Sequence, residues 1–459
     1  MTPSLKKVRK LLSNAAKVLF LRVGGAALSF LFSVLVSRLL GAEGAGLYFL
    51  AFSVMMFTSV LGRLGLDGTI LRYIAIHASV GKWGPVRGAF RKIMLVMGAA
   101  TATLGVLLAL GSELMAQYVF GKPELAGPLF WMGLAVIPLS HTRLLSQALK
   151  GLNKVATAEA VGTLVQPLFG LMLIYPLVAL LGVNGATLAY CGSSAVAAGL
   201  GYLLWSRTAR RWQVPPEAPG NRELVDSAMP LWLSTTVNQA VVPWAPVALL
   251  GLWAATSDVG IFGAANRLAN LIAVFLIGVN SVLAPQFAKL QATGRGQDIG
   301  PLARQFALVV TAAAMPVFLV LIFAGQWVMG FFGTSFREGG TVLAILAVGQ
   351  LSSTLCGSVR MVLLITGNEK GLRNASFTSL IVLLALSVLL IPPYGALGAA
   401  LASAGGTIVT NALPVYFVWK KMGIMTVPGL GLLFRDRTPA SGEAEDEKPG
   451  NDTDEGPGR

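Results

Sequence analysis

YPLVALLGVNGATLAYCGSSAVAAGLGY, residues 175–202, returns in altered form as IPPYGALGAALASAGGTIVTNALPVY, residues 391–416. Each stretch has proline near the end of an apolar segment, then a Gly-x-x-Gly-Ala turn, and then a segment rich in small residues. Apolar segments joined by so short a turn predict a pair of neighbouring helices. Two similar units far apart in one chain indicate an internal repeat.

Two further pairs of segments extend this repeat in the same order. LKGLNKVATAEA (149–160) matches LITGNEKGLRNA (364–375), and GAEGAGLYFLAF (41–52) resembles ATSDVGIFGAAN (255–266). All three pairs are offset by about 213–216 residues, so one unit of about six membrane spans occurs twice. An even number of spans per unit keeps the two copies in the same orientation, related by an axis along the membrane normal.

Composition places the repeat in a membrane. The chain has 459 residues, of which 55% are hydrophobic and only 12% charged. A soluble protein carries about 25% charged residues. Charge-poor stretches of about 20 residues recur, which is the length that crosses the bilayer as a helix. The sequence predicts an all-α integral membrane protein with about twelve spans, near residues 18–40, 45–70, 93–112, 125–147, 157–181, 183–205, 228–252, 259–284, 302–330, 340–365, 374–393 and 396–419.

The net charge of +15 comes from basic residues in alternate loops. They precede the first predicted span and follow every second one, whereas the intervening loops carry little positive charge. This positive-inside pattern predicts a multi-pass protein of the inner or plasma membrane with both termini in the cytoplasm. It also explains the basic excess without nucleic acid, which is not expected as a partner.

The expected domain organisation follows from the repeat. Residues 1–211 form the first six-helix bundle, 212–222 a cytoplasmic linker and 223–423 the second six-helix bundle. Residues 424–459 form a cytoplasmic tail whose acidic, Pro/Gly-rich end is expected to be disordered.

No catalytic or metal site is predicted. The two cysteines, Cys191 and Cys356, and the two histidines, His77 and His141, have no metal-ligand spacing. The chain carries neither a nucleophile motif nor a glycine-rich phosphate loop, and its loops are short. We therefore expect neither an enzyme nor a protein with a cofactor.

Taken together, the spans, the repeat, the LKGLNK/ITGNEK pair and the Gly-x-x-Gly-Ala turns resemble the multidrug/oligosaccharidyl-lipid/polysaccharide (MOP) superfamily. Within it, GLDGTILRYIA (65–75) resembles the end of the second span in the polysaccharide-transporter branch, and the likeness covers residues 14–423. The resemblance implies two six-helix bundles that form a V around a central cavity. It also implies a flippase that moves polyprenyl-diphosphate-linked oligosaccharide from the cytoplasmic to the outer leaflet for surface polysaccharide biosynthesis. Membrane lipids, glycan polymerases and glycosyltransferases are the other partners expected.

Arginine at membrane depth is the chemistry that a diphosphate cargo needs, because guanidinium is permanently charged and presents paired donors. Arg267 is near the middle of its span, beside a stripe formed by Asn266, Asn270 and Asn280. A polar stripe at this depth faces either a water-filled cavity or another helix, and we favour the cavity for Arg267 and these asparagines. Further cavity candidates lie in the inner half of their spans, where the alternative is snorkelling to the cytoplasmic surface: Arg22, Arg63, Arg143 and Arg360.

Two acidic residues are candidates for ion coupling. Asp67 lies four residues after Arg63, so the two side chains share a helix face and either neutralise each other or contact cargo or a coupling ion. Glu159 either binds a coupling cation or pairs with Lys154, and we favour the pair.

Three other classes of protein are considered. A drug/cation antiporter of the same superfamily would share the architecture but prefer acidic residues in its cavity. A major-facilitator transporter would have a long central loop and a Gly-Asp-Arg signature, where this chain has IHASVGKWGPVRGAFRK (76–92). A non-transporting scaffold of a membrane glycan-assembly complex is the third, and the deep Arg267 argues against it.

Overall fold

The computed structural model describes residues 5–212, 214–293, 295, 298–365, 369–422 and 427, and within them it contains helices and turns but no strand. In this part of the chain, 8 helices are long and apolar enough to cross a membrane. The predicted all-helical membrane fold is therefore confirmed. The predicted disordered tail lies outside the described residues, apart from Val427.

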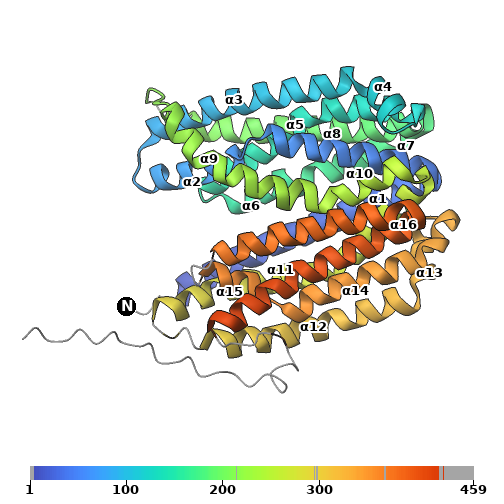
Figure 1. Ribbon diagram of the computed structural model, residues 1–459. Coiled ribbons are helices and arrows are strands. Elements are labelled where there is room, and N and C mark those ends of the chain that lie inside the picture. Colours follow the sequence, from blue (N-terminus) through green and yellow to red (C-terminus); the bar gives the residue numbers. More distant parts are fainter. Residues whose placement is uncertain are drawn as a thin grey trace, which may run out of the picture.

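The first half of the chain forms long helices that run side by side (Figure 1). Their bounds are α1 (Leu5–Gly62), α2 (Leu66–Ser79), α3 (Trp83–Leu110), α4 (Ser112–Leu114), α5 (Ala126–Gly151), α6 (Val155–Glu159), α7 (Val165–Leu181) and α8 (Val183–Ala209). Between α6 and α7 lies a π-helical turn, η3 (Ala160–Leu164). The long α1 is bent at Gly41, whose φ of 68° and ψ of −175° are not helical, so it contains two membrane-length segments.

The second half follows a short linker and also consists of long helices joined by short helical segments. Its helices are α9 (Asn221–Thr235), α10 (Val242–Trp253), α11 (Thr256–Ala292), α12 (Ile299–Phe323), α13 (Gly325–Met329), α14 (Gly340–Cys356), α15 (Val359–Ile365) and α16 (Glu369–Met422). A π-helical turn, η4 (Thr236–Val241), joins α9 to α10. The long α16 is bent at Gly395.

The two repeated turns have nearly the same backbone conformation. Gly182 has φ 56° and ψ −129°, and Gly395 has φ 52° and ψ −126°, a left-handed region that favours glycine. The second glycine of each motif is also matched. A Cβ at Gly185 would lie 1.9 Å from the Leu177 carbonyl oxygen, and one at Gly398 would lie 2.0 Å from that of Leu390. The similarity read from the sequence thus extends to local geometry.

Two predicted spans contain breaks that the hydropathy pattern does not reveal. The span predicted over 45–70 is interrupted between α1 and α2, where Leu64 and Gly65 have φ values of 51° and 71°. The span predicted over 340–365 is interrupted at Gly357, which has a φ of 59°. Each break lies within three residues of an arginine, Arg63 at the first and Arg360 at the second.

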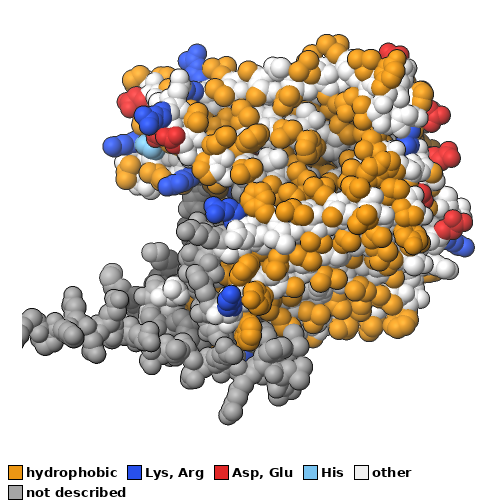
Figure 2. All heavy atoms as spheres, in the orientation of Figure 1, with side chains coloured by type: hydrophobic (Ala, Val, Ile, Leu, Met, Phe, Trp, Pro, Cys, Tyr) orange, Lys and Arg blue, Asp and Glu red, His pale blue; other side chains and the backbone are white. Residues whose placement is uncertain are grey.

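Charge divides the two ends of the molecule. In Figure 2, basic side chains gather at the end that carries α2 and the linker, and acidic side chains dominate the end that carries α4 and α13. We call these the basic end and the acidic end. On the face seen in Figure 2, hydrophobic side chains cover most of the surface between these ends, as expected for a surface that faces lipid.

The buried apolar side chains of the described residues form three clusters. The largest joins both halves of the chain and includes residues on both sides of the Gly41 bend and around the Gly395 turn. The other two involve segments nearer the basic end; one is built mainly from 66–158 with parts of α8 and α9, and the other from 283–418. The core is thus continuous toward the acidic end and divided toward the basic end.

Candidate functional site

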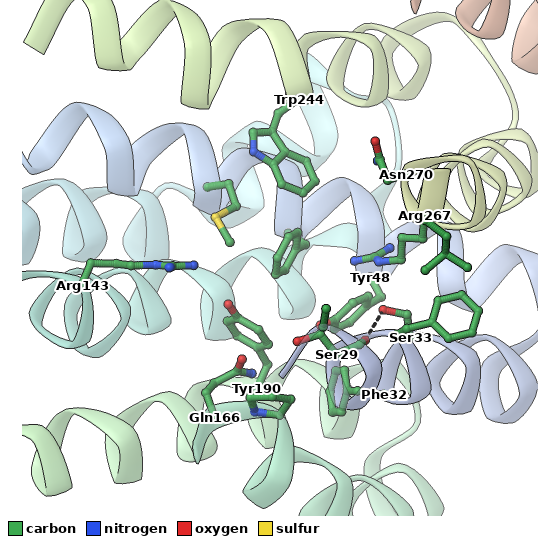
Figure 3. Close-up of a pocket in the computed structure, with 16 residues that line it drawn as sticks. Ser29, Phe32, Ser33, Tyr48, Arg143, Gln166, Tyr190, Trp244, Arg267 and Asn270 are labelled. Atoms are coloured by element: carbon green, nitrogen blue, oxygen red, sulfur yellow. Dashed lines mark hydrogen bonds between the residues drawn. The ribbon is translucent and has the colours of Figure 1, made fainter. Parts of the chain in front are cut away.

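A cavity of about 360 Å³ lies where the two halves of the chain meet (Figure 3). Its walls come from α1, α5, α7, α8, α10 and α11. The lining residues are Ala26, Ser29, Phe30, Phe32, Ser33, Tyr48, Phe52, Met56, Arg143, Gln166, Pro167, Tyr190, Trp244, Arg267, Asn270 and Leu271.

Arg267 enters this cavity from α11, about 17 Å along the helix from its start at Thr256. Its guanidinium carbon lies 4.1 Å from the centroid of the Phe49 ring and 5.6 Å from that of Phe52. Aromatic faces attract cations and replace part of the lost hydration. Among the described side chains, no carboxylate forms an ion pair with Arg267. Two aromatic rings therefore contact the Arg267 guanidinium, and its charge remains available to an anion.

Arg143 reaches the same cavity from α5, about 12 Å before that helix ends at Gly151. Figure 3 shows the Arg143 and Arg267 side chains pointing toward one another from opposite ends of the cavity, with Tyr190 beside the space between them. The lining contains no aspartate or glutamate. Two guanidinium groups without a carboxylate make the lining of the cavity positively charged.

Several lining residues were not predicted from the sequence. Tyr48 and Tyr190 are buried and bring hydroxyl groups to the cavity, and the half-buried Trp244 adds an aromatic wall. A tyrosine within an apolar helix was the available signal, because a buried hydroxyl needs a polar neighbour. Helix packing determines which tyrosines line the same cavity. The spacing of residues within one segment does not reveal this packing.

Asn270 lies between this cavity and a second one of about 210 Å³ that also includes Asn266 and Gln350. The Gln350 amide donates to the Asn270 side-chain oxygen at 2.8 Å, and the Asn270 amide donates to Asn266 at 3.4 Å. The predicted polar stripe of α11 therefore meets a polar residue of α14. Asn280 belongs to the same predicted stripe, but its side chain lies outside the described residues.

Arg63 and Asp67 form a buried ion pair, with Arg63 Nη1 at 2.7 Å from Asp67 Oδ2. Arg63 is only 7% exposed and Asp67 only 6%, so Arg63 does not snorkel to the basic surface. Arg63 Nη2 also donates to Gln239 Oε1 at 3.4 Å, which links the α1–α2 break to η4. The first of the two alternatives raised by their spacing, an ion pair between Arg63 and Asp67, is present in the structure. Neither residue lines the cavity that holds Arg267.

Glu159 is buried and pairs with Arg22 and Lys150. The expected pair with Lys154 is wrong: Lys154 Nζ donates instead to Thr208 Oγ1 at 2.8 Å. Five residues separate Lys154 from Glu159, which corresponds to about 140° around a helix, so their side chains point apart. Lys150 lies in the last turn of α5 and reaches the carboxylate across the α5–α6 turn.

Arg360 follows the Gly357 break and is half-buried in α15. Its Nη2 donates to Asn238 Oδ1 at 3.4 Å, so it contacts η4 of the second half. Of the predicted arginines, the structure brings Arg143 and Arg267 into one cavity. Arg22, Arg63 and Arg360 lie elsewhere, each with its own polar partner.

A family model described as "Polysaccharide biosynthesis protein" matches residues 11–291. The probable low-salt glycan biosynthesis flippase Agl15 of Haloferax volcanii is 22% identical over 450 residues, which cover 93% of this chain and 89% of that protein. The probable flippase AglR of the same organism is 22% identical over 396 residues, 83% of this chain and 79% of that protein.

Solved transporters share the fold. The lipid II flippase MurJ, in an inward closed conformation, superposes with a TM-score of 0.70 at 14% identity, covering 89% of this chain and 87% of that one. An inward-facing multidrug resistance MATE family transporter of the MOP superfamily gives a TM-score of 0.69 at 15% identity, covering 89% and 97%. At such identities the likeness establishes the fold.

Proposed function

Because the chain belongs to the polysaccharide biosynthesis protein family, we propose that it is a flippase for polyprenyl-diphosphate-linked oligosaccharide. It would move this lipid from the cytoplasmic to the outer leaflet by alternating access, for the assembly of a surface polysaccharide. The curated relatives it matches are named as flippases, one of them for glycan biosynthesis. The chain is a membrane transport protein of the MOP superfamily and not an enzyme.

The observation that carries the proposal is the pair of converging arginines. A diphosphate cannot enter hydrocarbon unless its charge is matched, and guanidinium matches phosphate with paired donors. Arg143 and Arg267 supply this match from opposite ends of one cavity that has no acidic lining residue. Placing an arginine at mid-span costs about 2.5–3.5 kcal/mol on insertion scales. Binding of an anionic cargo is a function that accounts for an arginine at this position.

The architecture in this proposal is two six-helix bundles, residues 1–211 and 223–423, which form a V that opens at the basic end. The divided core toward that end and the continuous core toward the acidic end support this arrangement. The positive-inside rule orients the basic end toward the cytoplasm, with both termini there. Cargo would then load from the cytoplasmic leaflet, near the glycosyltransferases that make it.

A close approach of α1 and α11 supports closure at the acidic end. A Cβ at Gly46 would lie 1.9 Å from the Thr256 carbonyl oxygen, and one at Gly260 would lie 2.1 Å from that of Ala42. The two glycines belong to the repeated segments 41–52 and 255–266. In this account, separation of α1 from α11 opens the cavity to the outer leaflet.

A drug/cation antiporter has less support. The two acidic candidates, Asp67 and Glu159, are each paired with a basic side chain of the protein and lie outside the arginine cavity. A coupling cation would have to displace those partners.

Deleting the gene tests the function in cells. We expect lipid-linked oligosaccharide to accumulate in the cytoplasmic leaflet and a surface glycan to be lost. Wild type and Arg211→Ala, which removes an exposed linker arginine, should both restore the glycan. Arg267→Ala should not restore it, although its abundance is unchanged. Normal glycan display in the deletion strain, together with new sensitivity to cationic dyes, would favour drug export instead.

A further inference from the structure

The ion cluster of Arg22, Glu159 and Lys150 contains one more positive charge than a structural pair requires. Arg22 donates to Glu159 Oε1 from Nε at 3.0 Å and from Nη2 at 2.7 Å. Lys150 Nζ lies 3.1 Å from the same oxygen. The three residues come from α1, α5 and α6, so two helices each supply a cation to one buried carboxylate.

The two cations differ from Glu159 in their access to solvent. The Glu159 side chain is 3% exposed, whereas the side chains of Lys150 and Arg22 are 24% and 44% exposed. A buried carboxylate needs a partner at all times, because an uncompensated charge in the interior is costly. A largely exposed guanidinium has no such need, since water or another anion can replace its partner.

Arg22 does not line the arginine cavity, but it lies one helical turn before the residues of α1 that do. Ala26, Ser29 and Ser33 line that cavity, and they follow Arg22 by four, seven and eleven residues. Those spacings place all four residues on one face of α1. Arg22 is one turn, about 6 Å, nearer the basic end than Ala26. An anion that enters from the basic end therefore passes Arg22 before it reaches Arg267.

The backbone around Arg22 is held against the first half. A Cβ at Gly25 would lie 2.7 Å from the Thr163 carbonyl oxygen, so α1 touches η3 directly at this point. π-helical turns of this kind often mark functional sites. With the backbone fixed, contact between Arg22 and cargo needs only a change of side-chain rotamer, which is a fast local motion.

We propose that these three residues form an exchangeable latch: Arg22 leaves Glu159 to bind the incoming diphosphate, and Lys150 alone then neutralises Glu159. Lys150 is thus a positioning residue that makes the release of Arg22 possible. Without it, departure of Arg22 would strand a buried carboxylate, and Arg22 would stay bound to Glu159. The inference rests on the proposed anionic cargo and adds the step by which that cargo is received.

Binding to the purified full-length chain in nanodiscs tests the latch, with geranyl diphosphate and inorganic pyrophosphate as probes. Lys150→Met should raise the Kd by about tenfold, the scale of one charge-assisted hydrogen bond. Lys150→Arg should bind like wild type. Glu159→Gln frees Arg22 and should bind more tightly than wild type. The double variant Lys150→Met/Glu159→Gln should regain the affinity lost in Lys150→Met, because nothing then retains Arg22.

The double variant distinguishes the latch from its alternatives. It removes the buried Glu159 charge together with that of its partner Lys150, which favours folding. Affinity no better than that of Lys150→Met would overturn the proposal, and so would weaker binding by Glu159→Gln alone. The variants should rank in the same order for both probes, because the latch contacts the diphosphate; an order seen only with geranyl diphosphate contradicts it. If the wild-type chain binds neither probe, the proposed function itself fails. If Arg267→Ala weakens binding but the double variant shows no rescue, only the latch fails.

Discussion

At the scale of single residues, the arginines differ in what surrounds their charge, and from that difference we propose a structural role for Arg63 and a functional role for Arg267. Arg63 is enclosed and paired with Asp67, whereas Arg267 rests on two phenylalanine rings and points into a cavity. Spacing along the sequence could predict the Arg63–Asp67 pair, because the two residues are only four apart, and the pair forms although the break between α1 and α2 separates them. It could not predict that Arg143 faces Arg267, since their helices meet only in the folded protein.

Substitution of Arg267 tests its role in binding cargo. Arg267→Lys keeps the charge but loses the paired donors, so we expect a loss of transport by about tenfold, comparable to one charge-assisted hydrogen bond. Arg267→Ala should abolish transport. Both variants should express normally, because the described residues offer Arg267 no carboxylate that its loss would leave unpaired. Full activity of Arg267→Ala, measured as lipid flipping in proteoliposomes, would remove it from the site.

The Arg63–Asp67 pair should respond in stability instead. Asp67→Ala leaves the buried guanidinium unpaired, a change that costs about 3–5 kcal/mol in comparable buried pairs. The expected result is a lower melting temperature and lower abundance. Arg63→Met/Asp67→Ala removes both charges and should recover part of the loss. If Asp67→Ala melts like wild type but transports poorly, the pair acts in cargo handling or ion coupling.

At the scale of elements, the sequence was most informative where glycine is required. The Gly-x-x-Gly-Ala motif correctly located two matching turns, because a left-handed residue and a close backbone contact both exclude side chains. The breaks at Gly65 and Gly357 and the π-helical turns η3 and η4 were missed. Hydropathy records where a segment crosses the membrane, and it does not record where neighbouring helices distort the backbone.

The second glycine of each motif gives a matched prediction. Gly185→Ala would place a Cβ 1.9 Å from the Leu177 carbonyl oxygen, and Gly398→Ala would place one 2.0 Å from that of Leu390. Each should destabilise the protein by about 1–3 kcal/mol, the usual cost of overpacking. Gly199→Ala is the control, since nothing lies within 4 Å of its added Cβ. Thermal unfolding in detergent measures all three, and equal melting temperatures would contradict the repeated close contact.

At the scale of the whole molecule, composition predicted the membrane class, and the resemblance of the ordered motifs indicated the superfamily; the family match and the shared fold confirm that resemblance. The grouping of arginines into one cavity depends on how helices from both halves pack. For that reason the sequence proposed five arginines alike, and the structure separates them. The apolar core is continuous toward one end and divided toward the other, and in the proposed function the divided end admits the anion.

The central claim is that the arginine cavity moves a lipid diphosphate across the bilayer. The most direct measurement is flipping of a fluorescent polyprenyl-diphosphate oligosaccharide in proteoliposomes that contain the purified chain. We predict flipping by wild type and by Arg211→Ala, and none by Arg143→Ala/Arg267→Ala folded to the same melting temperature. Equal flipping by the cavity double variant, or transport of a cationic dye in place of the anionic lipid, would contradict the account.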